Sequence, residues 1–171
     1  MRRLRVNPDR STIVVEARSN VGPIAWEAVG PTGEFSLALG EGAPATTDPP
    51  PPAWLELRLD SLTSGNRAYD AELQRRLDTH RHPVARVELR EARRASNAHR
   101  FHVVALLRLH GVERDVDGEL QVEVRDDETV LVTGQQQIDI RDFGLPAPST
   151  LMLKVYPDVR VHLVVEGEPA D

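Results

Sequence analysis

Residues 112–124 read VERDVDGELQVEV, and apolar and charged side chains alternate along almost the whole stretch. Successive side chains of a β-strand point to opposite sides, so this period of two predicts a strand with one dry face and one wet face. Residues 151–166, LMLKVYPDVRVHLVVE, repeat the pattern. A chain built from such strands encloses an apolar interior.

The bulk composition limits the classes of protein. With 171 residues, 40% of them hydrophobic, and no shift in composition, we expect one domain spanning residues 1–171. A net charge of -6 and an aromatic content of 4% disfavour nucleic acid as a partner. The absence of cysteine excludes disulfides, thiolate metal sites and a cysteine nucleophile.

The N-terminus and the hydropathy bear on localisation. The basic start MRRLR is followed by VNPDR and not by the apolar stretch of an export signal. No apolar run approaches the roughly 20 residues that span a bilayer. We therefore expect a soluble, cytoplasmic protein that is not an integral membrane protein.

Further strands are predicted where β-formers alternate between turn residues, at residues 11–18, 24–28, 34–39, 54–60, 84–92, 100–109 and 129–140. Most of their links are short, which predicts antiparallel hairpins. Residues 40–52 are rich in Gly, Ala, Thr and Pro and end in four prolines. Because proline cannot donate a ladder hydrogen bond, we expect a Pro-rich surface loop there, with a docking motif as the alternative.

One segment changes period. Tyr69, Leu73 and Leu77 recur every four residues, which predicts an amphipathic helix from Ser64 or Asn66 to Asp78. About eight or nine strands with one helix between the middle strands predict a mainly β fold, a single antiparallel up-and-down barrel of about eight strands. Closure removes unpaired edges. A two-sheet sandwich stays open, because it shows the same alternation.

The candidate ligand-binding residues are the side chains that we place on the inner face. They are Ile13, Val15, Ile24, Trp26, Phe35, Leu37, Leu57, Val87, Leu89, Phe101, Val103, Leu107, Leu120, Val122, Ile138, Leu153, Val155 and Val161. The alternative is that they fill a solid core. Burying about 400 Å² of ligand at roughly 25 cal/mol per Å² yields about 10 kcal/mol, from which association removes at least about 4. Tight retention therefore predicts a long chain, such as a polyprenyl tail or a fatty acid.

Signals for chemistry are weak. His80 and His82 form an HxH pair, but His82 precedes Pro83 and no carboxylate lies at a ligand spacing, so we predict no metal site and no cofactor. Asp139, Arg141 and Asp142 are expected to form local ion pairs and turn hydrogen bonds. No nucleophile elbow, P-loop or dinucleotide motif is present. We predict no catalytic residues and a protein that is not an enzyme.

One strand is apolar on both faces. Val104 and Leu106 lie opposite Phe101, Val103 and Leu107. We expect the helix to cover them, with a homodimer as the alternative.

Three segments resemble the YceI-like family. Residues 59–88, LDSLTSGNRAYDAELQRRLDTHRHPVARVE, are similar to its strand, turn, helix and proline segment. Residues 106–116, LLRLHGVERDV, resemble its LTLHGVTRPV hairpin, and residues 138–145, IDIRDFGL, resemble its DFG corner. Together with NPDRSTIVVEARS at residues 7–19, the resemblance covers most of the chain.

The resemblance implies a lipocalin-like barrel that binds a long isoprenoid or similar lipid, with no established catalytic residues. This chain has Arg10 and Ser11 where many members carry a DPAHS motif, so a role of that histidine is not carried over. Three hypotheses follow: a lipid carrier or store, a barrel enzyme acting on a lipid-like substrate, and a stress or assembly protein with a filled core and a protein partner.

Overall fold

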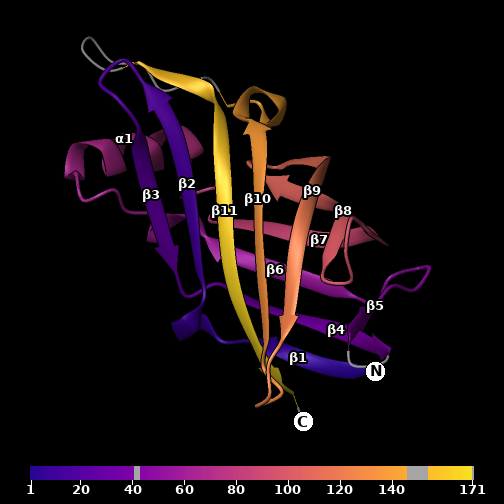
Figure 1. Cartoon of the computed structure of the whole chain (residues 1–171). Helices are drawn as coiled ribbons and strands as arrows, with labels where there is room; N and C mark the ends of the chain where they lie inside the picture. The colour runs from indigo at the N-terminus through magenta and orange to yellow at the C-terminus, as the bar shows by residue number, and fades with distance from the viewer. Residues whose placement is uncertain (41–42, 146–153, 171) are drawn as a thin grey trace.

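Eight antiparallel strands form a closed barrel in the computed structural model, which describes residues 1–40, 43–145 and 154–170. The ring closes because β1 pairs with β4 on one edge and with β11 on the other (Figure 1). Its members, in order, are β1 (Arg2–Val6), β4 (Thr32–Gly40), β6 (Ala53–Arg58), β7 (Val84–Arg94), β8 (Arg100–Leu109), β9 (Val112–Val124), β10 (Val130–Asp139) and β11 (Val155–Pro169). The predicted antiparallel barrel is confirmed.

Along one edge, the long strand β11 pairs with two other strands. Its first part, Val155 to Val164, pairs with β2 (Thr12–Ser19), and its last part, Gly167 to Pro169, pairs with β1. β3 (Ile24–Val29) continues the wall beyond β2. A two-way backbone bridge between Glu27 and Thr63 then ties β3 to the segment that leads into the helix.

The sequence analysis did not predict strand β1, although this strand completes the barrel. Leu4 and Val6 are buried, at 0% and 4% exposure, whereas Arg3 and Arg5 lie outside and face Glu34 of β4. Three of the five residues of β1 are arginines, so only two apolar positions remain. A pattern of two positions is too short to identify a strand from its alternation.

The one predicted helix is confirmed as α1 (Arg67–Leu77), between β6 and β7. The Asn66 side chain accepts hydrogen bonds from the backbone N–H groups of Ala68 and Tyr69, so it caps the first turn. At the other end Asp78 adopts a left-handed conformation, with φ of 50°, and its N–H closes the last turn. No helix among the described residues is long and apolar enough to cross a membrane.

Two predicted boundaries need correction. The strand expected over residues 54–60 ends at Arg58, and Leu59–Ser61 form a 3-10 turn, η2, in which the Leu59 N–H bonds the Pro83 carbonyl. The stretch expected to be loop at 40–52 contains a short strand, β5 (Ala43–Ala45), which pairs with β4 and buries Pro44. Proline is tolerated there because β5 is an edge strand. Residues 151–153 of the predicted last strand lie outside the described residues.

Two apolar clusters occupy the two ends of the barrel. One lies at the end of the barrel formed by β1, the lower end in Figure 1. It consists of Leu4, Phe101, Val122 and Val130, with Phe35 and Leu37 against them. The other lies near α1 and contains Trp26, Leu59, Leu62, Leu77 and Phe143. The second cluster also includes residues of η3 (Ile140–Phe143), the turn between β10 and β11.

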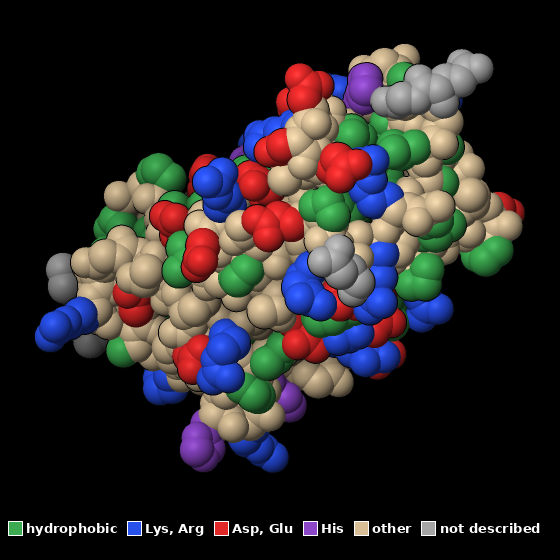
Figure 2. Space-filling model, turned by 90° about the horizontal axis from the view of Figure 1, so that it is seen from below, with side chains coloured by type: hydrophobic (Ala, Val, Ile, Leu, Met, Phe, Trp, Pro, Cys, Tyr) green, Lys and Arg blue, Asp and Glu red, His purple; other side chains and the backbone are tan. Residues whose placement is uncertain are grey.

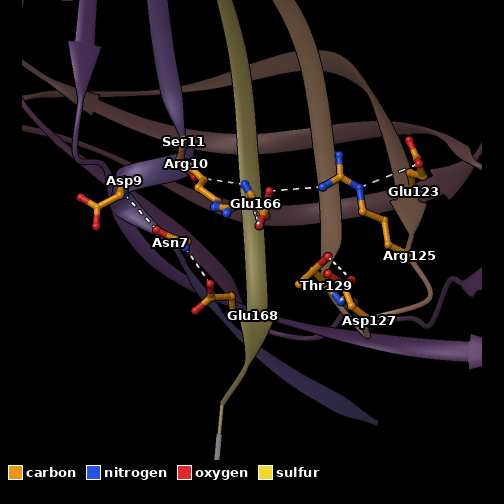
Figure 3. A network of polar contacts seen from close by, with 10 residues as sticks. All are labelled: Asn7, Asp9, Arg10, Ser11, Glu123, Arg125, Asp127, Thr129, Glu166 and Glu168. Atoms are coloured by element: carbon orange, nitrogen blue, oxygen red, sulfur yellow. Dashed lines mark hydrogen bonds and ion pairs between the residues drawn. The ribbon is translucent and has the colours of Figure 1, made fainter.

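A polar network joins η1 (Pro8–Arg10) to the strands at the lower end. Glu166 of β11 is only 10% exposed in its side chain, and Arg10 and Arg125 approach it from two sides, at 3.8 Å and 3.3 Å (Figure 3). The Glu166 N–H also donates to Ser11 Oγ, at 3.0 Å. Elsewhere on the lower face, acidic and basic side chains are interspersed and apolar ones lie between them in small groups (Figure 2).

Candidate functional site

The barrel encloses an apolar cavity of about 440 Å³. The lining follows the inner face of β8 from Phe101 to Leu109, which spans roughly 26 Å at about 3.3 Å per residue. Ligand pockets usually have volumes of about 300–1,000 Å³ and are mostly apolar. The interior is therefore hollow, long and of a size that suits a chain-like ligand.

Most of the predicted inward-facing residues do line this cavity. Of the set given above, all do so except Ile24 and Leu153. Ile24 is buried at 7% exposure within the apolar cluster near α1, but it does not border the cavity. Leu153 lies outside the described residues. That the lining residues contact a ligand stays a prediction.

The helix contributes to the lining in a way that the sequence did not reveal. Leu73 and Leu77 of α1 face the cavity, together with Leu59 and Leu62 of the η2 segment. The expectation that the helix covers Val104 and Leu106 is therefore wrong, because those two side chains lie on the outer face of β8.

Leu106 is buried without the helix, at 8% exposure within the single chain. Its cross-strand neighbours are Glu88 on β7 and Asp115 on β9. Ion pairs hold the long side chains around it, with Arg108 at 2.8 Å from Glu113 and 4.0 Å from Glu88. The aliphatic stems of such residues cover apolar surface while their charges stay in water. The burial of Leu106 therefore requires no second subunit.

Few polar side chains border the cavity from within. Gln136 of β10 shares the inner face with Ile138, and its Nε2 donates to the Gln137 carbonyl at 3.0 Å. At the helix end, Arg76 borders the cavity and its Nε lies 2.8 Å from Glu72 Oε1. Arg76 and Arg75 both bond Glu72 and hold the pKa of that carboxyl below its usual value.

The groups that could have carried chemistry have structural roles. The Asp139 carboxylate accepts hydrogen bonds from the Arg141 N–H and guanidinium, at 2.9 Å and 2.7 Å, and these bonds lower the pKa of Asp139. This is the local ion pair that the sequence predicts. The rings of His82 and His110 meet edge to face, with centroids 4.9 Å apart. Within the described ranges no three histidine, aspartate or glutamate side chains are grouped to hold a metal ion.

Solved structures with a similar fold come from several bacteria. BcnA of Burkholderia cenocepacia is 14% identical over 94% of this chain and 98% of its own, with a TM-score of 0.79. A polyisoprenoid-binding domain from Saccharophagus degradans, implicated in plant cell wall breakdown, is 19% identical over 98% of both chains, with a TM-score of 0.76. The YceI protein of Campylobacter jejuni is 14% identical over 80% and 81%, with a TM-score of 0.61. At these identities the likeness shows the fold alone.

No curated protein matches the chain in sequence. The model of the YceI-like domain matches residues 4–167, which begin within β1 and end within β11. The match includes all three segments on which the sequence resemblance depends. The chain therefore belongs to the YceI-like domain family.

Proposed function

We propose that this protein binds the apolar chain of a long isoprenoid or a similar amphiphilic lipid inside its barrel, and carries or stores it without chemical change. The observation that supports the proposal is the elongated cavity, whose lining is almost entirely aliphatic and aromatic. Burial of a flexible chain in such a cavity is favourable at about 25 cal/mol per Å². The Saccharophagus structure of similar fold is a polyisoprenoid-binding domain, which agrees with this ligand class.

The two alternatives find less support. A barrel enzyme needs a group of polar side chains directed at one point of the interior, whereas most of the lining among the described residues is apolar. A protein with a filled core has no cavity of about 440 Å³. Binding without catalysis is the function that the described residues favour.

Two measurements test the proposal. The purified protein is extracted with organic solvent, and the extract is analysed by mass spectrometry for a co-purified lipid. Geranylgeraniol is then titrated into delipidated protein while tryptophan fluorescence is followed, because Trp26 and Trp54 both border the cavity. We expect a saturable change of fluorescence with a dissociation constant in the micromolar range or below.

A matched pair of variants tests whether the ligand lies inside the barrel. Ala105 borders the cavity on β8, whereas Ala25 is exposed on the outer face of β3. Ala105→Phe fills part of the cavity and is expected to weaken geranylgeraniol binding by roughly tenfold or more, whereas Ala25→Phe leaves it unchanged. Equal binding by both variants, or no binding by the wild type, would refute the proposal.

A further inference from the structure

The wall of the barrel is not paired continuously between β9 and β10. Their ladder runs from Val130–Val124 to Gln135–Glu119 and stops there. Beyond that point β9 continues to Val112 with β8 alone, and β10 continues to Asp139 with β11 alone, within the residues that the structure describes. Figure 1 shows the two strands running together at the lower end and separating toward η3.

A polar pocket of about 320 Å³ lies over this gap between the strands. Val116, Asp117, Gln136 and Ile138 line both the pocket and the internal cavity. Asp117, Glu119 and Gln135 stand at outward positions of their strands and still border the cavity. At this gap, therefore, little more than one layer of side chains separates the cavity from the outer surface.

Gln136 is the side chain that fills the gap. Its amide oxygen faces Gly118 of β9, where a β carbon would come within 3.1 Å of it. Its amide nitrogen bonds the neighbouring Gln137 carbonyl on the same strand, at 3.0 Å. A rotation of this one flexible side chain opens the gap without breaking any strand pair, because glycine leaves the opposite flank bare.

Among the described residues, two other parts of the lining are held more firmly, and the alternative entry is the end beside β5, where Thr46, Thr47, Pro50 and Pro51 border the cavity. At the lower end Leu4, Phe101, Val122 and Val130 pack into a buried apolar cluster that borders the cavity. Outward residues Trp54 and Arg86 also border the cavity, but β6 and β7 stay paired there. The Arg86 guanidinium lies over the Trp54 ring, at 4.5 Å, and Glu56 and Glu88 hold it in place.

We propose that the gap between β9 and β10 is the portal through which the lipid enters and leaves, and that Gln136 is its gate. This inference rests on the proposed function. The apolar chain passes inward, and the polar end of the lipid stays at the gap, because moving a polar group into an apolar cavity without partners costs several kcal/mol. Side chains of Gln136 and Asp117 and the unpaired backbone edge of β9 offer that end hydrogen bonds.

The experiment blocks the gap reversibly. The chain has no cysteine, so Gln136→Cys introduces a single thiol, which benzyl methanethiosulfonate modifies and a reductant restores. The control is Gln121→Cys, at an exposed outer position where β9 and β10 are paired. Stopped-flow tryptophan fluorescence then gives the rates at which geranylgeraniol associates and dissociates.

We expect the modified Gln136→Cys protein to show both rates reduced by roughly tenfold or more, with recovery after reduction. The modified Gln121→Cys protein is expected to keep the wild-type rates. Wild-type rates after modification at 136, or a thiol there that the reagent does not reach, would overturn the portal and assign entry to a barrel end. In that case the wild type still binds geranylgeraniol, whereas failure of the proposed function abolishes that binding.

Gly118→Val provides a second test that needs no thiol. It narrows the gap from the β9 flank, and we expect slower association and dissociation with an unchanged circular dichroism spectrum. Wild-type rates in folded Gly118→Val protein count against the portal in the same way.

Discussion

The guanidinium of Arg94 donates a hydrogen bond of 2.7 Å from Nη2 to the Pro44 carbonyl, and so ties the end of β7 to β5. Arg94→Ala is expected to lower the free energy of unfolding by about 1 kcal/mol and to speed hydrogen exchange in β5. Arg93→Ala, at the exposed neighbouring position, serves as the control. If geranylgeraniol also exchanged faster in Arg94→Ala, entry through the β5 end would replace entry between β9 and β10.

Two glycines of β4 should respond differently to the same substitution. A β carbon on Gly33 would collide with the Trp54 carbonyl oxygen and lie 3.2 Å from Leu55 Cα. Because both belong to the paired backbone of β6, Gly33→Ala is expected to cost about 2 kcal/mol of stability. The nearest atom to a β carbon on Gly40 is Ala45 Cβ, at 3.7 Å. Gly40→Ala should change the free energy of unfolding, measured by urea denaturation, by less than about 0.5 kcal/mol.

The carboxylate of Glu166 can be compared with that of Glu168 on the same strand. Glu166 is nearly buried between Arg10 and Arg125 (Figure 3), whereas exposed Glu168 accepts a bond from Asn7 Nδ2, at 2.6 Å. Glu166→Gln is expected to destabilise the protein by about 1–2 kcal/mol. Glu168→Gln makes the same change of charge and should cost less than about 0.5 kcal/mol. Similar losses in thermal denaturation would contradict this difference.

Asp70 links the first turn of α1 to the segment that bridges β3. Partial burial alone would raise the pKa of Asp70, but hydrogen bonds from the Ser64 hydroxyl and amide and the Thr63 hydroxyl hold it below the ordinary value of 3.8. Because the folded value is the lower one, this carboxylate stabilises the protein above about pH 4 and loses its contribution as the pH falls.

Ser64→Ala removes one of these donors, and we expect the pKa of Asp70 to rise toward 3.8 in a carboxyl NMR titration. The acid unfolding midpoint should move to higher pH in the same variant. An unchanged titration would show that the backbone amide and Thr63 suffice.

The pocket over the gap is acidic, with four carboxylates and one guanidinium from Asp115, Asp117, Asp139, Asp142 and Arg114. Geranylgeranyl diphosphate should therefore associate more slowly than geranylgeraniol. Asp117→Asn is expected to raise the association rate of geranylgeranyl diphosphate by roughly twofold or more at low salt. This increase should shrink as the salt concentration rises. Asp126→Asn, in the turn at the other end of β9, is the control. Equal acceleration by both variants would show a general effect of net charge.

The sequence predicted the barrel and most of its lining because both follow from the period of two. Inward residues recur at every second position, so the sequence alone places Val103, Leu107 and Val161 on the inner face. The helix was equally clear, since Asn66 and Pro83 bound a run of period four. At Leu59 a local hydrogen bond, from its N–H to the Pro83 carbonyl, ends the strand earlier than the alternation predicts.

What the sequence could not show concerns which strands meet. The alternation is interrupted at Gly118 and in the run Gln135–Gln137, but the sequence does not show that these two positions face each other where β9 and β10 part. The direction of Leu73 and Leu77 was misjudged for the same reason: an apolar helix face fits the outside of a strand or the end of a cavity equally well. Strand pairing and side-chain packing are tertiary contacts, and the periodicity of the sequence does not determine them.

The contact of Leu4 with Pro169 makes neighbours of two strands from distant parts of the chain. Such a contact forms late in folding, because the entropy of the long intervening loop must be overcome first. Until then β4 and β11 each expose an unpaired strand edge. A strand of another chain can pair with that edge as readily as β1 can. Aggregation during refolding should therefore begin at this seam, and a soluble peptide with the sequence RRLRV would act there as a competitor.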